Sequence, residues 1–235
     1  MKTFLPLTPW LNRTHPLPSF KYFEGTSPVL EYGASVIFDY YVPLYKLHKE
    51  KARSLSTSWD EHKTYVEEAL EVINSDEGGW IDREEVEMIL EECGAPPNAC
   101  YPIYMFTVKK NDLEKVVYIG KTSSKSSRFS GGHTAATKMH NPKYNNFEKR
   151  VYFGCVTFLD EDNYLPLEWI HPKEFSLTLL DSIESQLIHN FKPEFNTQKK
   201  NRYLALHPTT IHIQNTCSDS IYLNDYMVNP HKKSI

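Results

Sequence analysis

The sequence is poor in glycine and holds few cysteines. It has 9 glycines against 15 prolines in 235 residues, so we expect stiff connections between its elements. None of the cysteines forms a C-x-x-C pair, and their spacing fits neither a zinc site nor a small disulfide scaffold. We therefore expect reduced thiols and a cytoplasmic protein. The four cysteines are Cys93, Cys100, Cys155 and Cys217.

Long apolar runs are also missing. No stretch approaches the length of a membrane span, and four prolines interrupt the apolar residues between Pro6 and Pro18. We expect neither a signal peptide nor a membrane partner. No internal repeat is visible. The 40% hydrophobic and 24% charged residues are typical of a globular protein that is large enough to bury a core.

Acidic residues are scarce in one part of the chain only. Residues 1–99 carry 9 Lys and Arg against 17 Asp and Glu, whereas residues 100–235 carry 17 against 13. Residues 121–150 hold 7 basic side chains and a single acid, Glu148. This pattern is compatible with a polyanion bound at one face, although a solvated helix face gives the same pattern.

The first hundred residues are predicted to contain two helices. Residues 58–74 have apolar side chains at helical spacing, and the sequence that begins at Ser58 matches a capping box. A second helix is predicted over residues 82–93, with Asp82 as its N-cap. Residues 31–48 are dense in apolar and aromatic side chains, and they fit either a buried helix or a pair of strands.

The loop between these two helices partly fits a calcium-binding EF-hand. Counted from Asn74, it has Asp76 third, Gly79 sixth and Glu85 twelfth, where an EF-hand needs a ligand, a sharp turn and a bidentate carboxylate. However, Asn replaces the first Asp, and Gly78 stands where a ligand side chain is needed. A plain helix–turn–helix linker is the favoured interpretation.

A β-hairpin is predicted directly after a proline-rich boundary at residues 95–98. Short apolar runs around Tyr104 and Tyr118 flank the polar loop KKNDLEK, which predicts two antiparallel strands. Residues 151–158 alternate like a third strand, and residues 177–191 have the apolar stripe of a helix. The last 35 residues alternate weakly and are predicted to add a strand or two.

Several short motifs and single polar residues in this part of the chain have an order and a spacing that bear on function. They are Pro102-Ile103-Tyr104, Tyr118-Ile119-Gly120, Arg128, His133, Glu184 and Asn196. In this order and spacing they resemble the motifs of the GIY-YIG nuclease family, over about residues 100–200. The first motif has Pro in place of its first Gly, and the second is complete. Gly131-Gly132 separates Arg128 from His133, which puts these two side chains five residues apart instead of four.

The residue types suit phosphodiester hydrolysis, which needs an activated water, a neutralised phosphate and support for the leaving oxygen. Arg128 suits the phosphate because its guanidinium makes two parallel hydrogen bonds. Glu184 suits Mg²⁺, with Mn²⁺ as a substitute, and is expected to be the only protein ligand. A free tyrosine has a pKa of about 10, so Tyr104 needs nearby cations such as Lys121 to act as a base.

The resemblance implies a role for each motif residue. Tyr104 is then the general base for the attacking water, Tyr118 orients that water or contacts the phosphate, and His133 relays the proton of Tyr104. Asn196 positions the phosphate or the helix that carries Glu184. Each residue taken alone fits a plain structural role, and their joint order favours a nuclease. The side chains expected to contact DNA are Lys121, Lys125, Arg128, Lys138, Lys143, Lys199 and Lys200.

The resemblance also implies a fold. It is an α+β arrangement within the broad α/β class, with a small, mostly antiparallel three-stranded sheet flanked by helices and an N-terminal helical extension. We predict an N-terminal arm and extension over residues 1–98 and the nuclease core over residues 99–200. A C-terminal extension packed on the core is predicted over residues 201–235.

The predicted function is Mg²⁺-dependent, site-specific cleavage of double-stranded DNA. The compact chain, with additions at both ends of the core, resembles a stand-alone type II restriction enzyme. Such an enzyme would cut both strands as a homodimer, because one site cuts one strand. Alternatives are a structure-specific, phage or repair nuclease of the same family, and a relative that binds DNA without cutting it. A third class is an interaction protein organised by the calcium-like loop, with calcium-dependent stability and no DNA affinity.

Overall fold

The computed structural model describes residues 6–17, 21–22, 33–50, 54–122, 129, 132–160, 163–217 and 225–230. The α-helices are α1 (Thr8–Leu11), α2 (Leu55–Val72), α3 (Arg83–Glu92), α4 (Thr134–Lys138) and α5 (Lys173–Phe191). Short 3₁₀ helices are η1 (Leu44–Lys49), η2 (Pro142–Tyr144) and η3 (Leu167–Trp169). The strands are β1 (Lys21–Tyr22), β2 (Ala34–Pro43), β3 (Ile103–Lys110), β4 (Leu113–Lys121), β5 (Glu148–Asp160), β6 (Asn163–Pro166), β7 (Ile170–His171), β8 (Ile211–Asn215) and β9 (Asp225–Val228).

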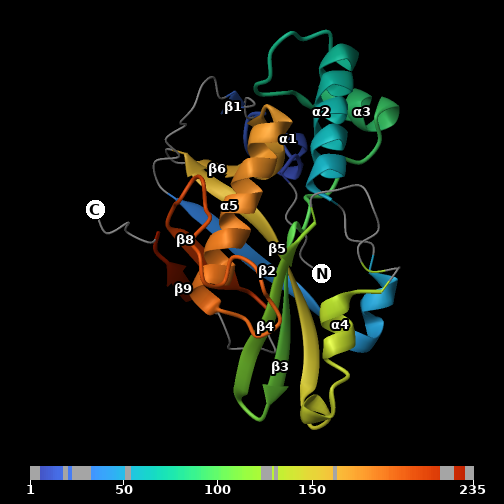
Figure 1. Ribbon diagram of the computed structural model, residues 1–235. Coiled ribbons are helices and arrows are strands. Elements are labelled where there is room, and N and C mark those ends of the chain that lie inside the picture. The colour runs from blue at the N-terminus through green and yellow to red at the C-terminus, as the bar shows by residue number, and fades with distance from the viewer. Residues whose placement is uncertain are drawn as a thin grey trace, which may run out of the picture.

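A mixed sheet of seven strands forms the centre of the fold (Figure 1). Its order is β4-β3-β5-β2-β8-β9, and β6 pairs with one end of β5. The pair β2–β8 is parallel, and the other pairs of this sheet are antiparallel. The expected three-stranded sheet is therefore wrong. β4, β3 and β5 do form an antiparallel run, but it is less than half of a larger mixed sheet.

The extra strands come from segments with weak local signals. β2 lies in the segment that fitted either helix or strand, and it is at least partly buried along its whole length, so no period of two is visible. β8 does alternate buried and half-buried residues, but it pairs Ile211 with the distant Ala34. The sheet thus takes strands from residues 1–98, 99–200 and 201–235 and places them side by side.

The three predicted helices are present, and two of them, α2 and α5, begin earlier than predicted. Helix α2 is capped by Ser54, whose side chain accepts a hydrogen bond from the Thr57 N–H at 3.1 Å. The predicted cap Ser58 is instead fully buried, and it donates a hydrogen bond to Glu168 at 3.0 Å. Helix α3 has Asp82 as its cap, as predicted. Helix α5 begins at Lys173, four residues before the predicted start.

The loop between α2 and α3 uses its distinctive residues for capping and docking. Glu85 accepts a hydrogen bond from the Asp82 N–H at 2.6 Å and completes a capping box. The Gly79 carbonyl accepts hydrogen bonds from the Trp10 indole at 3.1 Å and from the Leu17 N–H at 3.0 Å. These contacts fasten the N-terminal arm to the linker, and they favour the helix–turn–helix interpretation over an EF-hand.

Apolar side chains pack on both faces of the sheet. Helix α5 packs on one face, where Met105, Ile119 and Ile183 belong to the core, and side chains of α2 and α3 extend the same core. The other face is covered by η1, α4 and η2, and its core includes Tyr104 and Phe106. Figure 1 shows α5 and α4 on opposite sides of the strands β3, β4 and β5. Strand β4 lies at the edge of the sheet, with one of these layers on each of its faces.

Candidate active site

The hairpin β3–β4 brings Tyr104 and Tyr118 to one face of the sheet. Tyr104 pairs with Gly120 and Phe106 with Tyr118, and the two tyrosine rings are 6.1 Å apart. His133 stacks on Phe106 at 5.1 Å, and its ring lies 5.3 Å from that of Tyr118. We call Tyr104, Phe106, Tyr118 and His133 the aromatic–histidine cluster. Three of the predicted catalytic residues therefore lie together.

The Tyr104 hydroxyl is hydrogen bonded to His133, with 3.0 Å between Oη and Nε2. The other ring nitrogen, Nδ1, accepts the N–H of Ala135 at 3.2 Å and caps α4. Since Nδ1 accepts, the neutral imidazole carries its proton on Nε2 and donates it to Tyr104. A hydrogen bond donated to a phenol oxygen favours the phenolate. This direction is the reverse of the predicted relay, in which His133 takes the proton of Tyr104.

Gly120 makes room for the Tyr104 ring. A Cβ atom built on Gly120 would lie 2.6 Å from Cζ and 2.6 Å from Oη of Tyr104, and 2.8 Å from Cε1 of Tyr118. Real Cβ atoms do not approach other atoms this closely, so a larger residue here would displace one of the two phenols. The glycine of the Tyr-Ile-Gly motif thus has a steric function in the cluster.

A small polar hollow of about 250 Å³ opens beside the cluster. Tyr118, His133, Thr134 and Lys138 line it, together with Phe195. Tyr104 itself is 0% exposed. The groups that face solvent are therefore the half-buried Tyr118 and His133, and Tyr104 lies behind them.

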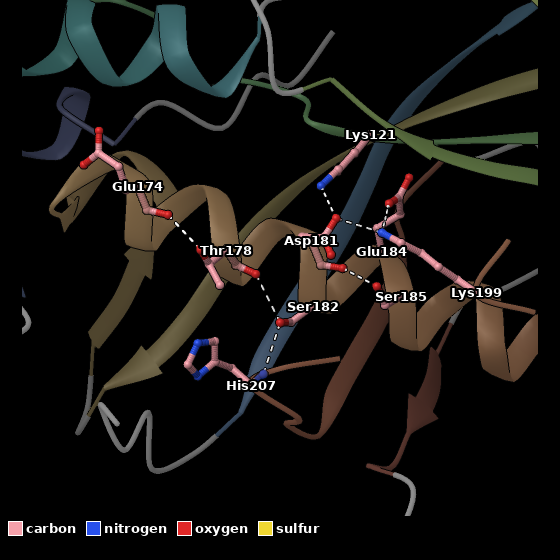
Figure 2. A network of polar contacts seen from close by, with 9 residues as sticks. All are labelled: Lys121, Glu174, Thr178, Asp181, Ser182, Glu184, Ser185, Lys199 and His207. Carbon is pink, nitrogen blue, oxygen red and sulfur yellow. Dashed lines mark hydrogen bonds and ion pairs between the residues drawn. The ribbon is translucent and has the colours of Figure 1, made fainter. Parts of the chain in front are cut away.

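A second group of predicted residues lies on α5 (Figure 2). Lys121, at the end of β4, pairs with Asp181. The Lys199 Nζ atom lies 2.7 Å from Asp181 Oδ1 and 2.7 Å from Glu184 Oε2. Asp181 and Glu184 are three residues apart, so they share one side of the helix. We call Lys121, Asp181, Glu184 and Lys199 the carboxylate–lysine network.

The charges of this network stabilise one another. Burial raises the pKa of the Asp181 carboxyl, but the hydrogen bonds from Lys121 and Lys199 outweigh it and bring that pKa below its usual value. Burial likewise lowers the pKa of Lys199, and its bonds to Asp181 and Glu184 reverse this effect and raise that pKa above its usual value. The side chains of Lys199 and Glu184 are only 17% and 12% exposed, so water screens this pair less than a surface ion pair.

The two groups flank the carboxyl end of β4. Successive residues of a strand point to opposite faces of the sheet. Tyr118 and Gly120 point toward the layer of α4, whereas Ile119 and Lys121 point toward α5. The predicted catalytic residues that the structure describes therefore lie on both faces of one edge strand.

Asn196 closes the outer edge of β4 between these groups. Its Oδ1 accepts the Ile119 N–H at 3.0 Å, and its Nδ2 donates to the Ile119 carbonyl at 2.8 Å. The adjacent Phe195 N–H bonds to the Val117 carbonyl at 2.8 Å. The amide of Asn196 thus replaces a missing neighbouring strand. This contact holds the chain that leaves α5 on the edge of β4.

The remaining predicted DNA contacts lie in several environments. Lys138 is exposed, and its ammonium lies 5.7 Å from the ring centre of Phe195. Lys143 is exposed and pairs with Glu194. Lys200 is half-buried. Two predicted residues lie outside the described part of the chain, namely Lys125 and Arg128.

The donor atoms around Glu184 fit a hard divalent cation. The Lys199 ammonium already bridges the carboxylates of Asp181 and Glu184, so this pair of oxygens stabilises positive charge. Mg²⁺ in proteins is often bound by one or two carboxylates, with water and phosphate completing the shell. Within the described residues, no three His, Cys, Asp or Glu side chains converge into a larger metal-binding group. Glu184 and Asp181 are therefore the two carboxylates that this side of α5 offers.

The sequence analysis did not identify Asp181, although its spacing from Glu184 could have indicated it. It precedes Glu184 by three residues, which places two acids on one side of a helix whose other side is apolar. The role of Phe106 as the stacking partner of His133 was missed as well. Its position two residues after Tyr104 already put both rings on one face of a strand.

The comparisons with known proteins add no relative. No family model, curated protein or solved structure matches the chain. No helix in the described ranges has both the length and the apolar character needed to cross a membrane. The resemblance of the motifs to GIY-YIG nucleases therefore stays a prediction.

Proposed function

We propose that the protein is a Mg²⁺-dependent endonuclease that hydrolyses phosphodiester bonds of double-stranded DNA. One observation carries this proposal. A buried phenol, Tyr104, accepts a hydrogen bond from His133 beside a polar hollow that also presents Tyr118 and Lys138. The hollow itself offers the Tyr118 hydroxyl and the Lys138 cation to a phosphate, and Tyr104 stands as a proton acceptor behind its wall.

In the proposed reaction, a DNA phosphate binds in the hollow against Lys138 and Tyr118. Because the phenol is buried in the described arrangement and must meet a water molecule to act as a base, substrate binding would admit a water molecule to the Tyr104 oxygen while His133 keeps its hydrogen bond to that oxygen. Tyr104 acts as the phenolate, having lost its own proton to solvent before the attack. The oxygen of the water attacks phosphorus, and the proton of that water passes to the phenolate oxygen of Tyr104. The bond from phosphorus to the leaving oxygen breaks, and solvent supplies the proton for that oxygen.

The carboxylate–lysine network supports this chemistry from the other side of β4. Glu184, with Asp181 beside it, would hold the Mg²⁺ ion. A bound ion would supply positive charge for the DNA backbone at this edge of the sheet. Lys121 and Lys199 keep the two carboxylates ionised and fixed in place. Asn196 keeps the chain after α5 on the edge of β4.

The finer features of the proposal follow from the same chemistry. Cleavage of both strands requires two sites, so we propose a homodimer on DNA, as in a type II restriction enzyme. None of the four cysteines, all of which the structure describes, is joined in a disulfide, and we propose that the enzyme works in the reducing cytoplasm.

A second candidate is a DNA-binding protein that does not cut. One observation favours it, because Glu184 is held by Lys199 instead of facing solvent as an open metal ligand. In this case the lysine would be a permanent substitute for the metal ion, and DNA binding would need neither Mg²⁺ nor Glu184.

Cleavage of plasmid and phage DNA, with Mg²⁺ and with EDTA, tests the proposal. The variant Glu184→Gln should lose cleavage, whereas Glu174→Gln, an exposed acid at the start of the same helix, should retain it. Discrete fragments that need Mg²⁺ and Glu184 would support a site-specific enzyme. A smear or nicked circles would support a nonspecific or structure-specific nuclease. DNA binding without cleavage of any substrate would contradict the catalytic proposal and favour the second candidate.

A further inference from the structure

A larger cavity of about 540 Å³ lies next to the polar hollow. It is enclosed by η1 on one side, by α4 on the other, and by the start of β5. Gly132 and His133 line both spaces, so the cavity and the hollow share a wall. A volume of this size falls within the range of small-molecule sites, roughly 300–1,000 Å³.

Apolar side chains form much of the cavity wall. Leu47 and Phe129 belong to the core on this face of the sheet, and other apolar lining residues pack against that core. The side chains of this wall offer no hydrogen-bond partner, so they suit the apolar body of a ligand and not the polar edges of a nucleobase. The apolar lining residues are Pro43, Leu44, Leu47, Phe129, Ala136 and Phe147.

A cation lies at the edge of this apolar wall. Lys149 alternates along the chain with Phe147 and Val151, and both of these lie with the core on the cavity side of the sheet. The side chain of Lys149 therefore points to the same side, where the residue lines the cavity and is half-buried. His140 is an exposed residue of the same lining, and its imidazole adds an N–H donor.

The carboxylate of Glu148 faces away from the cavity. Glu148 is the single acid among the described residues that line this space. Its two oxygens accept hydrogen bonds from Arg150 at 2.7 and 2.9 Å, and Arg150 also donates to the Tyr152 hydroxyl at 3.4 Å. Tyr152 belongs to the core on the α5 side, so these side chains lie on the opposite face of β5. The cavity is left with cationic and neutral side chains, which favour a negatively charged ligand.

We propose that the cavity binds a small organic anion, in which a flat apolar body carries a carboxylate. The body fills the space between η1 and α4 against Leu47 and Phe147, and the carboxylate meets Lys149 and His140. This site goes beyond the proposed function, because it requires neither DNA nor a metal ion. Its occupant would lie against His133, through which the cavity adjoins the candidate active site.

Calorimetry of the full chain with two probes of similar shape tests the preference for an anion. The probes are 2-naphthoate and the uncharged 2-naphthylmethanol, and we expect the carboxylate to bind about tenfold more tightly. Lys149→Met should remove most of that difference, because it keeps an apolar side chain and loses the charge. Lys115→Met is the matched control, since Lys115 is exposed on β4 and does not line the cavity.

A second pair of variants tests where the probes bind. Ala136→Phe should fill the cavity and abolish the binding of both probes. Thr137→Phe is the matched control, since Thr137 is the next residue of α4, is exposed and does not line the cavity. Circular dichroism shows whether each variant has folded, and the comparison with Lys149→Met holds even if Ala136→Phe does not fold.

The possible outcomes decide the proposal without reference to DNA cleavage. If neither probe binds, or if folded Ala136→Phe binds them as the unchanged protein does, the site is overturned. Equal affinities for the two probes, or equal effects of Lys149→Met and Lys115→Met, overturn the preference for an anion. Binding of dAMP as tight as that of 2-naphthoate would show that the cavity takes nucleotides instead. None of these measurements uses DNA or metal, so the nuclease proposal stands or fails separately.

Discussion

Tyr104 and Gly120 face each other across β3 and β4, and the phenol of Tyr104 lies where a side chain on residue 120 would begin. The distance from Tyr104 Oη to an ideal Cβ on Gly120 is 2.6 Å. The hydrogen bond between Tyr104 and His133 therefore depends on the absence of a side chain at Gly120 on β4. A residue without a side chain thus positions the proposed base.

We expect Gly120→Ala to destabilise the protein by about 1–3 kcal/mol, because the added methyl group overpacks the cluster. Cleavage should fall as well, since Tyr104 must move away from His133. Gly79→Ala is the control, because a Cβ there meets no heavy atom within 4 Å. Urea unfolding and cleavage assays of both variants check this prediction. Equal stabilities for the two variants would contradict the steric function of Gly120.

The two phenols should differ in their contributions to cleavage. Tyr104→Phe removes the proposed base, and we expect a loss of roughly 100-fold or more in the rate of DNA cleavage. Tyr118→Phe removes a hydroxyl that orients water or contacts phosphate, so a smaller loss and weaker DNA binding are expected. Single-turnover rates with saturating protein separate the two effects. Full activity of Tyr104→Phe would show that the buried phenol takes no proton, and would transfer the catalytic role to Tyr118.

The parts of the fold that were predictable rest on local chemistry. Asp82 was predicted correctly as the N-cap of α3, because capping depends only on residues within one turn of the helix. The strands around Tyr104 and Tyr118 are joined by a short turn, in which Asn111 adopts a positive φ of 55°. Asparagine tolerates this conformation, which is why the polar loop indicated a hairpin.

The parts that were not predictable depend on partners far away in the sequence. Ser54 and Ser58 are both suitable caps, and the choice depends on Glu168, which accepts the Ser58 hydroxyl across 110 residues. The sheet extends beyond three strands because Ala34 pairs with Ile211. Lys199 was predicted to contact DNA, but the chain after α5 turns back and places its ammonium on Asp181 and Glu184. A local sequence pattern does not determine which distant residues a segment contacts in the folded chain.

Lys199 should compete with a metal ion for the two carboxylates. We expect Lys199→Met to increase the affinity for Mn²⁺ by about tenfold, which corresponds to about 1.4 kcal/mol, because the bridging cation is removed. Without metal the variant should be less stable, since the two carboxylates then repel each other. Added Mn²⁺ should raise its melting temperature more than that of the unchanged protein. Calorimetry and thermal unfolding check both effects, with Lys200→Met as the neighbouring control. Equal Mn²⁺ affinities would place the metal elsewhere.

Asn196 should contribute to stability through the edge of β4. Asn196→Ala removes the partners of the Ile119 N–H and carbonyl at a site where the asparagine is only 9% exposed. Leaving such groups without partners costs about 1–3 kcal/mol, so we expect a loss of stability of that order. Asn201→Ala, an exposed residue just beyond, should change little. Hydrogen exchange at the Ile119 amide checks the mechanism, because its protection should fall in Asn196→Ala alone.

The stability of the protein should fall in mildly acidic solution because of His171. Burial, and to a smaller extent the charge of Lys63, together lower the pKa of this imidazole to about 4, against a smaller opposing effect of Glu67. In the unfolded chain the pKa returns to about 6.5, so between pH 6.5 and pH 4 the unfolded state binds more protons than the folded state. The free energy of unfolding should therefore decrease as the pH falls, by up to about 1.4 kcal/mol per pH unit from this group.

His171→Phe isolates this contribution, since it keeps a ring beside Trp59, whose centre lies 4.4 Å from that of His171. Urea unfolding of both proteins at pH 7, 6, 5 and 4 gives the difference in stability at each pH. Carboxylates that titrate in this range affect both proteins alike and cancel in the difference. We expect the variant to gain stability relative to the unchanged protein as the pH falls toward 4. A difference that stays constant with pH would contradict this prediction. It would show that the pKa of His171 is the same in the folded protein as in the unfolded chain.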